Sequence, residues 1–431
     1  TNTDSVIINP SNLKDEKNRG IVAFEKTPTT SDVTSGIKKS LEGLFEKLTA
    51  SNPEIRSDEI CSVTIGTTHF INAVVERDPM KLDRIAVIRL VGPCSRELPP
   101  FSDFPRDLAS LINGYTCYCD GGYRINRKEI SHINKSEIIS NCEKIREIGL
   151  NTIAVIGMFS PVAKDQEIAV RKIIKDTFTD WNVDIVLSQE IGGIGFLERE
   201  NITIINAAIK RFAISVIHSF QQAVREFGLD CQILLTQNDG TALTVKDAIR
   251  TPIKTFSSGT TNSMRGASFL CRKELQAFTE NKPVLVLDIG GTTTDAGLLE
   301  TNGFPRHYST HTLVGGVRTI LSKPDVRSIG LGAGSIVRIE EDVNNRTLMS
   351  IGPDSVASSL ETKALVFGGK IATTTDIALL SRSDKEIRSS KNPIFQNVHL
   401  DNVKRNFSEA LTKKYNDQIK IMIDQLVDTI K

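Results

Sequence analysis

The sequence predicts an α/β protein, because short apolar segments alternate along the chain with segments whose apolar residues recur at helical spacing. Residues 85–88 and 152–156 show the first pattern, and residues 138–145 show the second. A chain of 431 residues that is 39% hydrophobic can bury a large core, and two domains are expected at this length.

In the first part of the chain, Ser31-Asp32 is a helix start signal. A predicted helix follows it, with apolar positions at Ile37, Leu41, Leu44, Phe45 and Leu48. Residues 61–66 are a predicted strand that closes on a glycine turn. Residues 93–122 contain four prolines and little periodicity, so they are predicted to form a loop-rich insertion.

The later elements follow the same logic. A predicted helix carries an apolar stripe at Ile138, Ile139, Cys142 and Ile145. Residues 198–227 predict one long helix joining two halves, and strands are expected at 232–236 and 284–288. Residues 402–431 predict a charged helical tail with a solvated face. The expected division near residue 190 gives domains of residues 1–190 and 191–431.

The charge balance and cysteine content exclude several classes of protein. The chain has 53 basic and 52 acidic residues, a net charge of +1, which argues against binding to nucleic acid or an anionic membrane. Cys117 and Cys119 form a C-x-C without a second pair at zinc-finger spacing, so a metal site is not favoured there. With no run of 18 apolar residues and no signal peptide pattern, a cytoplasmic location is expected.

The segment VLVLDIGGTTTDAGLL, residues 284–299, is the strongest candidate site. Val284 to Leu287 predict a buried strand, and Asp288 stands near its end. Gly290 and Gly291 allow positive φ and close approach of a ligand, while Thr292, Thr293 and Thr294 offer hydroxyl groups. Successive amides in such a turn can form a nest for an anion. The unit is therefore a strand, a turn and a second strand.

This geometry differs from the two commonest phosphate loops. A Walker loop requires a lysine and a following helix, and a dinucleotide fingerprint also requires a helix after its glycines. A hairpin tip suits the terminal phosphates of a nucleotide, and Asp288 and Asp295 are then candidate carboxylates for Mg²⁺. The alternative is a structural hairpin in which aspartate only forms the turn.

An internal repeat adds a second candidate site. The chain opens with TNTDSVII, which matches TTTDAGLL at residues 292–299 and suggests duplicated domains. The repeat makes Thr1, Asn2 and Thr3 candidates for nucleotide binding and Asp4 a candidate catalytic carboxylate.

Other polar residues have weaker signals. Asn262 and Arg265 are three residues apart, so both could face a phosphate or carbonyl oxygen. Residues 198–201 are either an ordinary helix start or part of a cleft floor. His307 and His311 would make a metal pair only in a helix, which Pro305 disfavours.

The sequence resembles the hydantoinase/oxoprolinase A family along nearly its whole length. Ten motifs occur in order, and together they are far more specific than any one of them: IGTTHFINAVVER (65–77), GMFSP (157–161), FLERENITIINA (196–207), NDGT (238–241), FSSGTTNSMRGASFL (256–270), DIGGTTTD (288–295), GFPR (303–306), VGGVRT (314–319), SIGLGAGS (328–335) and FGGKIATTTD (367–376).

The resemblance implies an actin-like ATPase architecture, with two ribonuclease-H-like halves around a nucleotide cleft. It implies an ATP- and Mg²⁺-dependent hydrolase that phosphorylates the carbonyl oxygen of a lactam, hydantoin or 5-oxoproline-like ring, which water then attacks. It implies a cleft role for His69, and His69, Asn72, Asn262 and Arg265 are the weaker candidates for orienting substrate or phosphate. The expected partner is a B-type subunit or a fused C-terminal domain, and homo-oligomers are left open.

Departures from the family pattern favour a second hypothesis, a non-catalytic nucleotide-binding or assembly subunit. The Asp-x-Gly-Gly of the first phosphate hairpin would lie upstream of Thr1, and a Gly-rich segment for adenosine would lie beyond Lys431. Thr260 stands where the family has proline, and Ala333 interrupts a run of glycines. A third hypothesis, a sugar-kinase-like phosphotransferase, shares the hairpin but has no support from the other motifs.

Overall fold

The computed structural model describes residues 2–15, 17–28, 33–272, 282–307, 311–341, 347–380, 382 and 398–430. Its contacts group the chain into two compact units that are discontinuous in sequence. The first unit comprises residues 1–55, 263–306 and 325–431, and the second comprises residues 56–262 and 307–324. The continuous division expected near residue 190 stays a prediction. Each unit is mixed α/β, in agreement with the predicted fold class.

The second unit is built on a parallel sheet in the order β5-β4-β6-β7. Its strands are β4 Ile85–Leu90, β5 Asn113–Cys119, β6 Thr152–Gly157 and β7 Asp184–Leu187. All residues of β4 and β6 are buried. Continuous burial is typical of a parallel sheet covered by helices on both faces.

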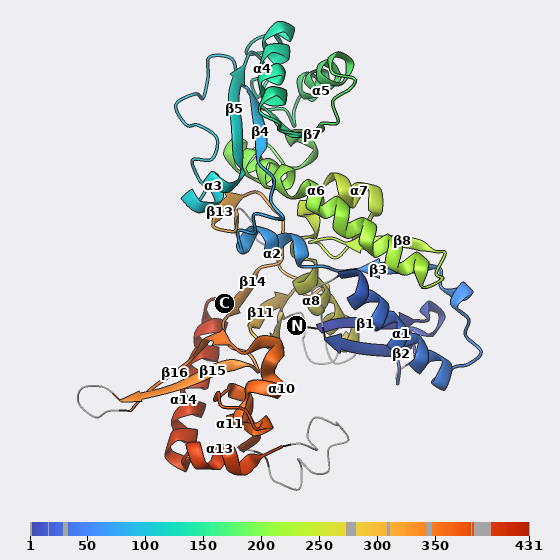
Figure 1. Cartoon of the computed structure of the whole chain (residues 1–431), viewed down its shortest axis with the longest axis vertical. Helices are drawn as coiled ribbons and strands as arrows, with labels where there is room; N and C mark the ends of the chain where they lie inside the picture. Colours follow the sequence, from blue (N-terminus) through green and yellow to red (C-terminus); the bar gives the residue numbers. More distant parts are fainter. Residues whose placement is uncertain are drawn as a thin grey trace. The chain divides into compact units, whose positions relative to one another are not determined.

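Three helices of this unit cover the sheet. Residues of α4 (Lys135–Glu147) and α5 (Asp165–Thr177) share one core with alternate strand residues, and Figure 1 shows both helices beside the sheet. The long helix α6 (Phe196–Glu226) contacts β4, β6 and β7. The loop-rich prediction for residues 93–122 was partly wrong, because they contain α3 (Arg106–Ile112) and β5. β5 pairs along β4, which its proline-rich surroundings did not reveal.

Helix α6 is a core helix of the second unit rather than a connector between halves. It is long and apolar enough to cross a membrane by composition alone, but 61% of the apolar window is buried within the protein. It also carries Glu200, which forms a buried bidentate pair with Arg89 of β4, at 2.8 Å to Nε and 2.5 Å to Nη2. This pair fixes the register of the helix on the sheet.

The second unit also holds a smaller sheet in the order β3-β8-β9 and a hairpin. Its remaining elements are β3 Ser62–Ile65, α2 His69–Val75, β8 Gln232–Thr236, β9 Ala242–Thr244, α7 Val245–Arg250, and the hairpin strands β12 Thr312–Val314 and β13 Val317–Thr319. Gly315 and Gly316 form the hairpin turn, both with positive φ. Helix α8 (Ser258–Leu270) begins in this unit and ends in the first.

The first unit contains a three-stranded antiparallel sheet in the order β10-β11-β14. The strands are β10 Val284–Ile289, β11 Thr294–Leu299 and β14 Val326–Ile329. The strand–turn–strand prediction for residues 284–299 is confirmed, but burial of β10 was wrong. Among the described residues β10 pairs with β11 alone, so it is an edge strand on which Leu285, Leu287 and Ile289 are exposed.

A second core of this unit joins the hairpin β15–β16 to the C-terminal helices. The elements are β15 Ser335–Glu341, β16 Thr347–Ser355, α10 Leu360–Lys363, α11 Thr374–Leu380, α13 Leu400–Asn406 and α14 Glu409–Asp428. The predicted helical tail is therefore two helices, and Figure 1 shows α13 beside α11. One side of α14 is solvated as predicted, while Tyr415 and Leu426 are buried.

The chain start forms an antiparallel pair, β1 (Asn2–Ile8) and β2 (Ile21–Pro28), with α1 (Val33–Ser51) packed on it. Leu44 and Leu48 of α1 meet Ala23 of β2 in a small core. The helix predicted from residues 37–48 is confirmed.

Candidate functional site

The β10–β11 hairpin brings the two predicted metal-side carboxylates together. Asp288 and Asp295 are direct partners in the antiparallel ladder, so their side chains project from the same face of the sheet. Ser328 of β14 donates a hydrogen bond from Oγ to Asp295 Oδ1 at 2.5 Å. The hairpin therefore presents a pair of acidic groups, one of which is oriented by the next strand.

The electrostatics of this pair fit a cation. Burial raises the pKa of Asp295, the nearby charge of Asp288 raises it further, and the Ser328 hydrogen bond opposes both effects. Two adjacent carboxylates that repel each other are stabilised by a divalent cation, and Mg²⁺ accepts one or two carboxylates with water and phosphate oxygens. Asp288 and Asp295 would hold Mg²⁺ there. Among the described residues no group of three or more His, Cys, Asp or Glu side chains could bind a metal, so phosphate and water oxygens would supply the other ligands.

The turn between the strands offers donors for an anion. Gly290 donates to Thr293 O at 2.8 Å, which closes the turn. The backbone N–H groups of Gly291, Thr292 and Thr293 have no hydrogen-bond partner among the described residues. Neither glycine has positive φ, so that predicted reason for glycine was wrong. A Cβ on Gly291 would meet no atom within 4 Å, which leaves space for a ligand against the backbone.

The glycine loop at residues 328–335 packs directly on this turn. Ala333 N donates to Gly290 O at 2.9 Å, and Gly334 N donates to Gly291 O at 2.7 Å. A Cβ on Gly332 would lie 2.5 Å from Thr292 N, closer than real contacts allow. Glycine is therefore required at residue 332 because two backbone segments touch. The sequence predicted no separate role for this loop, although its alternating glycines at 330, 332 and 334 were a signal of close backbone approach.

A third motif, at residues 367–376, donates hydrogen bonds to carbonyl groups of the glycine loop. Thr374 Oγ1 donates to Gly332 O at 2.5 Å and to Ala333 O at 2.7 Å, and Thr375 Oγ1 donates to Ala333 O at 2.7 Å. Asp376 accepts from Val366 N and Thr373 N, each at 2.6 Å, and fixes the start of α11. Three motifs far apart in sequence thus meet at the β10–β11 turn. Residues 288–295 contain the turn, residues 328–335 pack on it, and residues 367–376 hold residues 328–335 by hydrogen bonds.

The first predicted hairpin is less complete. Thr1 lies outside the described residues, and Asn2 and Thr3 are in β1. Asp4 is exposed and pairs with Lys26 of β2 at 3.3 Å. Among the described residues no hydrogen bond or ion pair joins Asp4 to the β10–β11 hairpin, and its catalytic role stays a prediction.

A second convergence of motifs lies in the second unit. Thr67, next to His69, donates from its N–H to Ser258 Oγ at 3.2 Å, and Ser258 Oγ donates to Thr67 O at 3.0 Å. A Cβ on Gly66 would lie 2.4 Å from Asn262 Nδ2, and this amide donates to Thr236 Oγ1 at 3.2 Å. The start of α2 and the start of α8 are thus locked together.

His69 and Asn72 are placed differently in α2. His69 is at the first turn of the helix, and burial lowers the pKa of its imidazole. Asn72 is exposed. The cleft roles that the resemblance implies for these two residues stay predictions.

Arg265 has local partners that differ from those of Asn262. It donates from Nη1 to Gly303 O at 2.9 Å, and its guanidinium lies 3.9 Å from the centroid of the Phe304 ring. These contacts belong to the GFPR motif of the first unit. Arg265 therefore supports the end of α8, and the structure does not bring it together with Asn262 on a shared partner.

Residues 198–201 form more than an ordinary helix start. Arg199, Glu200 and Asn201 are buried, and Asn201 Nδ2 donates to Arg318 O at 2.9 Å. Arg318 in turn contacts Glu198 at 3.2 Å. The FLEREN and VGGVRT motifs are therefore joined by direct contacts within the second unit.

The two residue pairs that the sequence disfavoured as metal sites lie in different settings. His307 is in an isolated β-bridge with Pro324 rather than a helix, as Pro305 predicted. Cys117 and Cys119 are buried in the core beside Cys142, and a hydrogen bond with Cys119, together with burial, raises the pKa of the Cys117 thiol. Protonated buried thiols are poor metal ligands.

The fold is similar to that of two solved enzymes. One is acetone carboxylase, from a study of ATP-dependent acetone carboxylation, with a TM-score of 0.61 and 17% identity over 88% of this chain and 53% of that chain. The other is the ATP-dependent caprolactamase from Pseudomonas jessenii, with a TM-score of 0.69 and 18% identity over 95% of this chain and 58% of that chain. The chain thus spans little more than half the length of either. No curated protein matches it.

The family assignment rests on matches along nearly the whole chain. Residues 199–430 match the hydantoinase/oxoprolinase family, and residues 1–178 match the hydantoinase/oxoprolinase N-terminal region. The chain belongs to the hydantoinase/oxoprolinase family, as its ordered motifs indicated.

Proposed function

We propose that this chain is the ATP-using component of an enzyme that opens a cyclic amide by phosphorylating its carbonyl oxygen. The observation that carries the proposal is the supported β10–β11 turn, which combines free amides, hydroxyl groups and an opposed carboxylate pair. Family membership and similarity to an ATP-dependent caprolactamase agree with it. In this proposal the two units are the halves of an actin-like ATPase, and the protein is cytoplasmic.

The chemistry explains why ATP is needed. An amide carbon is a weak electrophile because nitrogen donates electrons into the carbonyl group. Transfer of the terminal phosphoryl group of ATP to the carbonyl oxygen releases ADP and makes the ring carbon electrophilic. Water adds to that carbon, the ring nitrogen takes a proton and leaves as the amine when the C–N bond breaks, and hydrolysis of the remaining acyl phosphate gives the carboxylate and inorganic phosphate. Phosphoryl transfer depends on positioning and charge neutralisation rather than on a covalent nucleophile.

Each part of the turn has a role in this scheme. The free amides of Gly291 and Thr292 bind oxygens of the terminal phosphate. Asp288 and Asp295 would hold Mg²⁺, which would supply positive charge to offset the charge that develops on the phosphates. The glycine loop holds the turn rigid, so the donors are already oriented before ATP binds. A B-type partner or a further domain is proposed for the water step.

Phosphate release, measured with candidate partner subunits over a panel of five- to seven-membered lactams and imides, tests the proposal. ATP turnover should rise in proportion to ring opening. Asp288→Asn and Asp295→Asn should each reduce turnover about a hundredfold. The matched control is Asp354→Asn, because Asp354 is an exposed carboxylate of the same unit that pairs with Arg338 at 2.6 Å.

Two outcomes would contradict the proposal. Ring opening without ATP would exclude the phosphorylation step. ATP turnover or binding with no dependence on any cyclic amide would favour the alternative, a nucleotide-binding or assembly subunit of a two-component hydantoinase or carboxylase.

A further inference from the structure

A polar pocket lies at the amino-terminal edge of the parallel sheet in the second unit. Its volume is about 400 Å³, within the range of small-molecule sites, and Asn151, Asn182, Asp184, Arg211, Ile214 and Ser215 line it. Asn151 directly precedes β6, and Asp184 is the first residue of β7. Asn182 lies two residues before β7 begins, and Arg211, Ile214 and Ser215 are on α6. The hairpin chemistry proposed above involves none of them.

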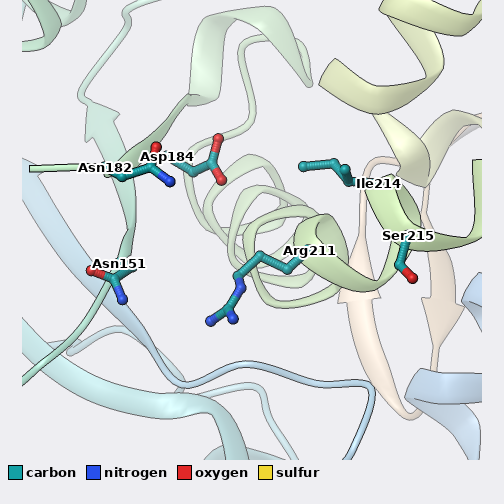
Figure 2. Close-up of a pocket in the computed structure, with 6 residues that line it drawn as sticks. All are labelled: Asn151, Asn182, Asp184, Arg211, Ile214 and Ser215. Carbon is teal, nitrogen blue, oxygen red and sulfur yellow. The ribbon is translucent and has the colours of Figure 1, made fainter. Parts of the chain in front are cut away.

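Several hydrogen-bonding groups in this pocket are unused. Asn151 Oδ1 accepts from the Trp181 indole at 3.0 Å, which fixes the side chain and leaves Nδ2 without a partner among the described residues. The side chain of Asn182 likewise has no partner there. Figure 2 shows the Arg211 guanidinium and the Asp184 carboxylate extending toward the same open space. Among the residues that the structure describes, the charged side chain of Arg211 pairs with Asp83 alone, at 3.5 Å, so most of its five N–H donors have no partner there.

The charges of the pocket balance. Asp184 pairs with Lys210 at 3.0 Å, and Arg211 lies near Asp83, so two acids and two bases sum to zero. Asp83 Oδ2 is buried without a hydrogen-bond partner among the described residues. A ligand with a net charge would upset this balance. A ligand that carries one charge of each sign would satisfy it, because its ammonium group can meet a carboxylate while its carboxylate meets the planar guanidinium.

We propose that this pocket binds a small zwitterionic amino acid, with its ammonium group on Asp184 and its carboxylate on Arg211. Ile214 provides the one apolar contact of the lining, suited to a short methylene chain between the two charged groups. Opening a lactam produces an amino acid of this type. That link rests on the proposed function, whereas the zwitterion assignment rests on the pocket itself.

Calorimetry with the full chain, without ATP or lactam, tests this proposal. The probes are 5-aminopentanoate, which has both charges, and pentanoate and pentylammonium, which each have one. We expect saturable binding of 5-aminopentanoate with Kd below about 1 mM, and binding at least about tenfold weaker for each single-charge probe. Arg211→Gln and Asp184→Asn should each weaken 5-aminopentanoate binding at least about tenfold.

Arg225→Gln is the matched control, because Arg225 is an exposed arginine of the same helix and does not line the pocket. It should leave affinity unchanged. If Asp184→Asn unfolds the protein by removing the partner of Lys210, Arg211→Lys keeps the charge, removes the planar fork, and should still weaken binding. No saturable binding up to about 10 mM, equal affinity for the three probes, or unchanged affinity in the Arg211 variants would overturn the proposal. None of these results depends on ATP turnover, so failure here and failure of the proposed function are distinguishable.

Discussion

Two glycine substitutions at the hairpin separate a ligand role from a structural one. Gly291 has negative or extended φ, and an added Cβ would meet no protein atom within 4 Å. Gly291→Ala should therefore leave the free energy of unfolding unchanged or raise it by up to about 1 kcal/mol, because alanine restricts the unfolded chain. ATP affinity should fall at least about tenfold, because the new methyl group occupies the space that we assign to phosphate.

Gly332→Ala should behave in the opposite manner. Its Cβ would lie 2.5 Å from Thr292 N and 2.7 Å from Gly291 C. Backbone atoms cannot rotate away as a side chain can, so the loop must shift. Overpacking of this kind costs about 1–3 kcal/mol of stability. ATP affinity should also fall, because the displaced loop no longer holds the turn.

Urea unfolding and calorimetry with ATP and Mg²⁺, applied to the native chain and both variants, measure these effects. We expect Gly291→Ala to lower ATP affinity without lowering the free energy of unfolding, and Gly332→Ala to lower both. A Gly291→Ala protein that binds ATP as well as the native chain would refute the ligand role of the turn, as would a native chain that binds no ATP. A Gly332→Ala protein of native stability would refute the packing argument.

Three further predictions concern charge and exposure. Glu200→Ala leaves Arg89 buried without its partner, so the free energy of unfolding should fall by about 3–5 kcal/mol in urea melts, and a loss under about 1 kcal/mol would contradict the buried pair. The pKa of Asp295 is raised, so a proton competes with Mg²⁺ for its carboxylate. The Mg²⁺ affinity measured by calorimetry should therefore weaken as pH falls through a value above the usual aspartate pKa of about 3.9. Asp295→Asn should abolish this pH dependence of Mg²⁺ affinity. Because the folded state favours protonated Asp295, the free energy of unfolding without metal should fall as pH rises through this range. Asp295→Asn should flatten that pH dependence in urea melts. Cys142 is buried with its pKa raised to about 12, so a thiol reagent should modify exposed Cys61 first and Cys142 only on unfolding, and equal rates would contradict the core placement.

The sequence by itself determined where several helices and strands lie, and that residues 284–299 form a strand, a turn and a second strand. Apolar periodicity is a local property, so it located α1, α4, α6 and the strands β4 and β6 within a few residues. The order Asp288, Gly290, Gly291, Asp295 also determined the turn and the facing of the carboxylates, since residues equidistant from a tight turn become partners in an antiparallel pair.

Only the tertiary structure decided what each local element touches, because packing depends on residues distant in sequence. It made β10 an edge strand, where the apolar pattern had indicated burial. It placed Arg265 on Phe304, although helical spacing had grouped it with Asn262. It also showed that Gly332 is required by contact with Thr292, forty residues earlier, whereas the space beside Gly291 is empty. Steric exclusion acts between segments that folding brings together. A backbone contact therefore requires glycine at residue 332, whereas at residue 291 we assign the space beside glycine to a ligand.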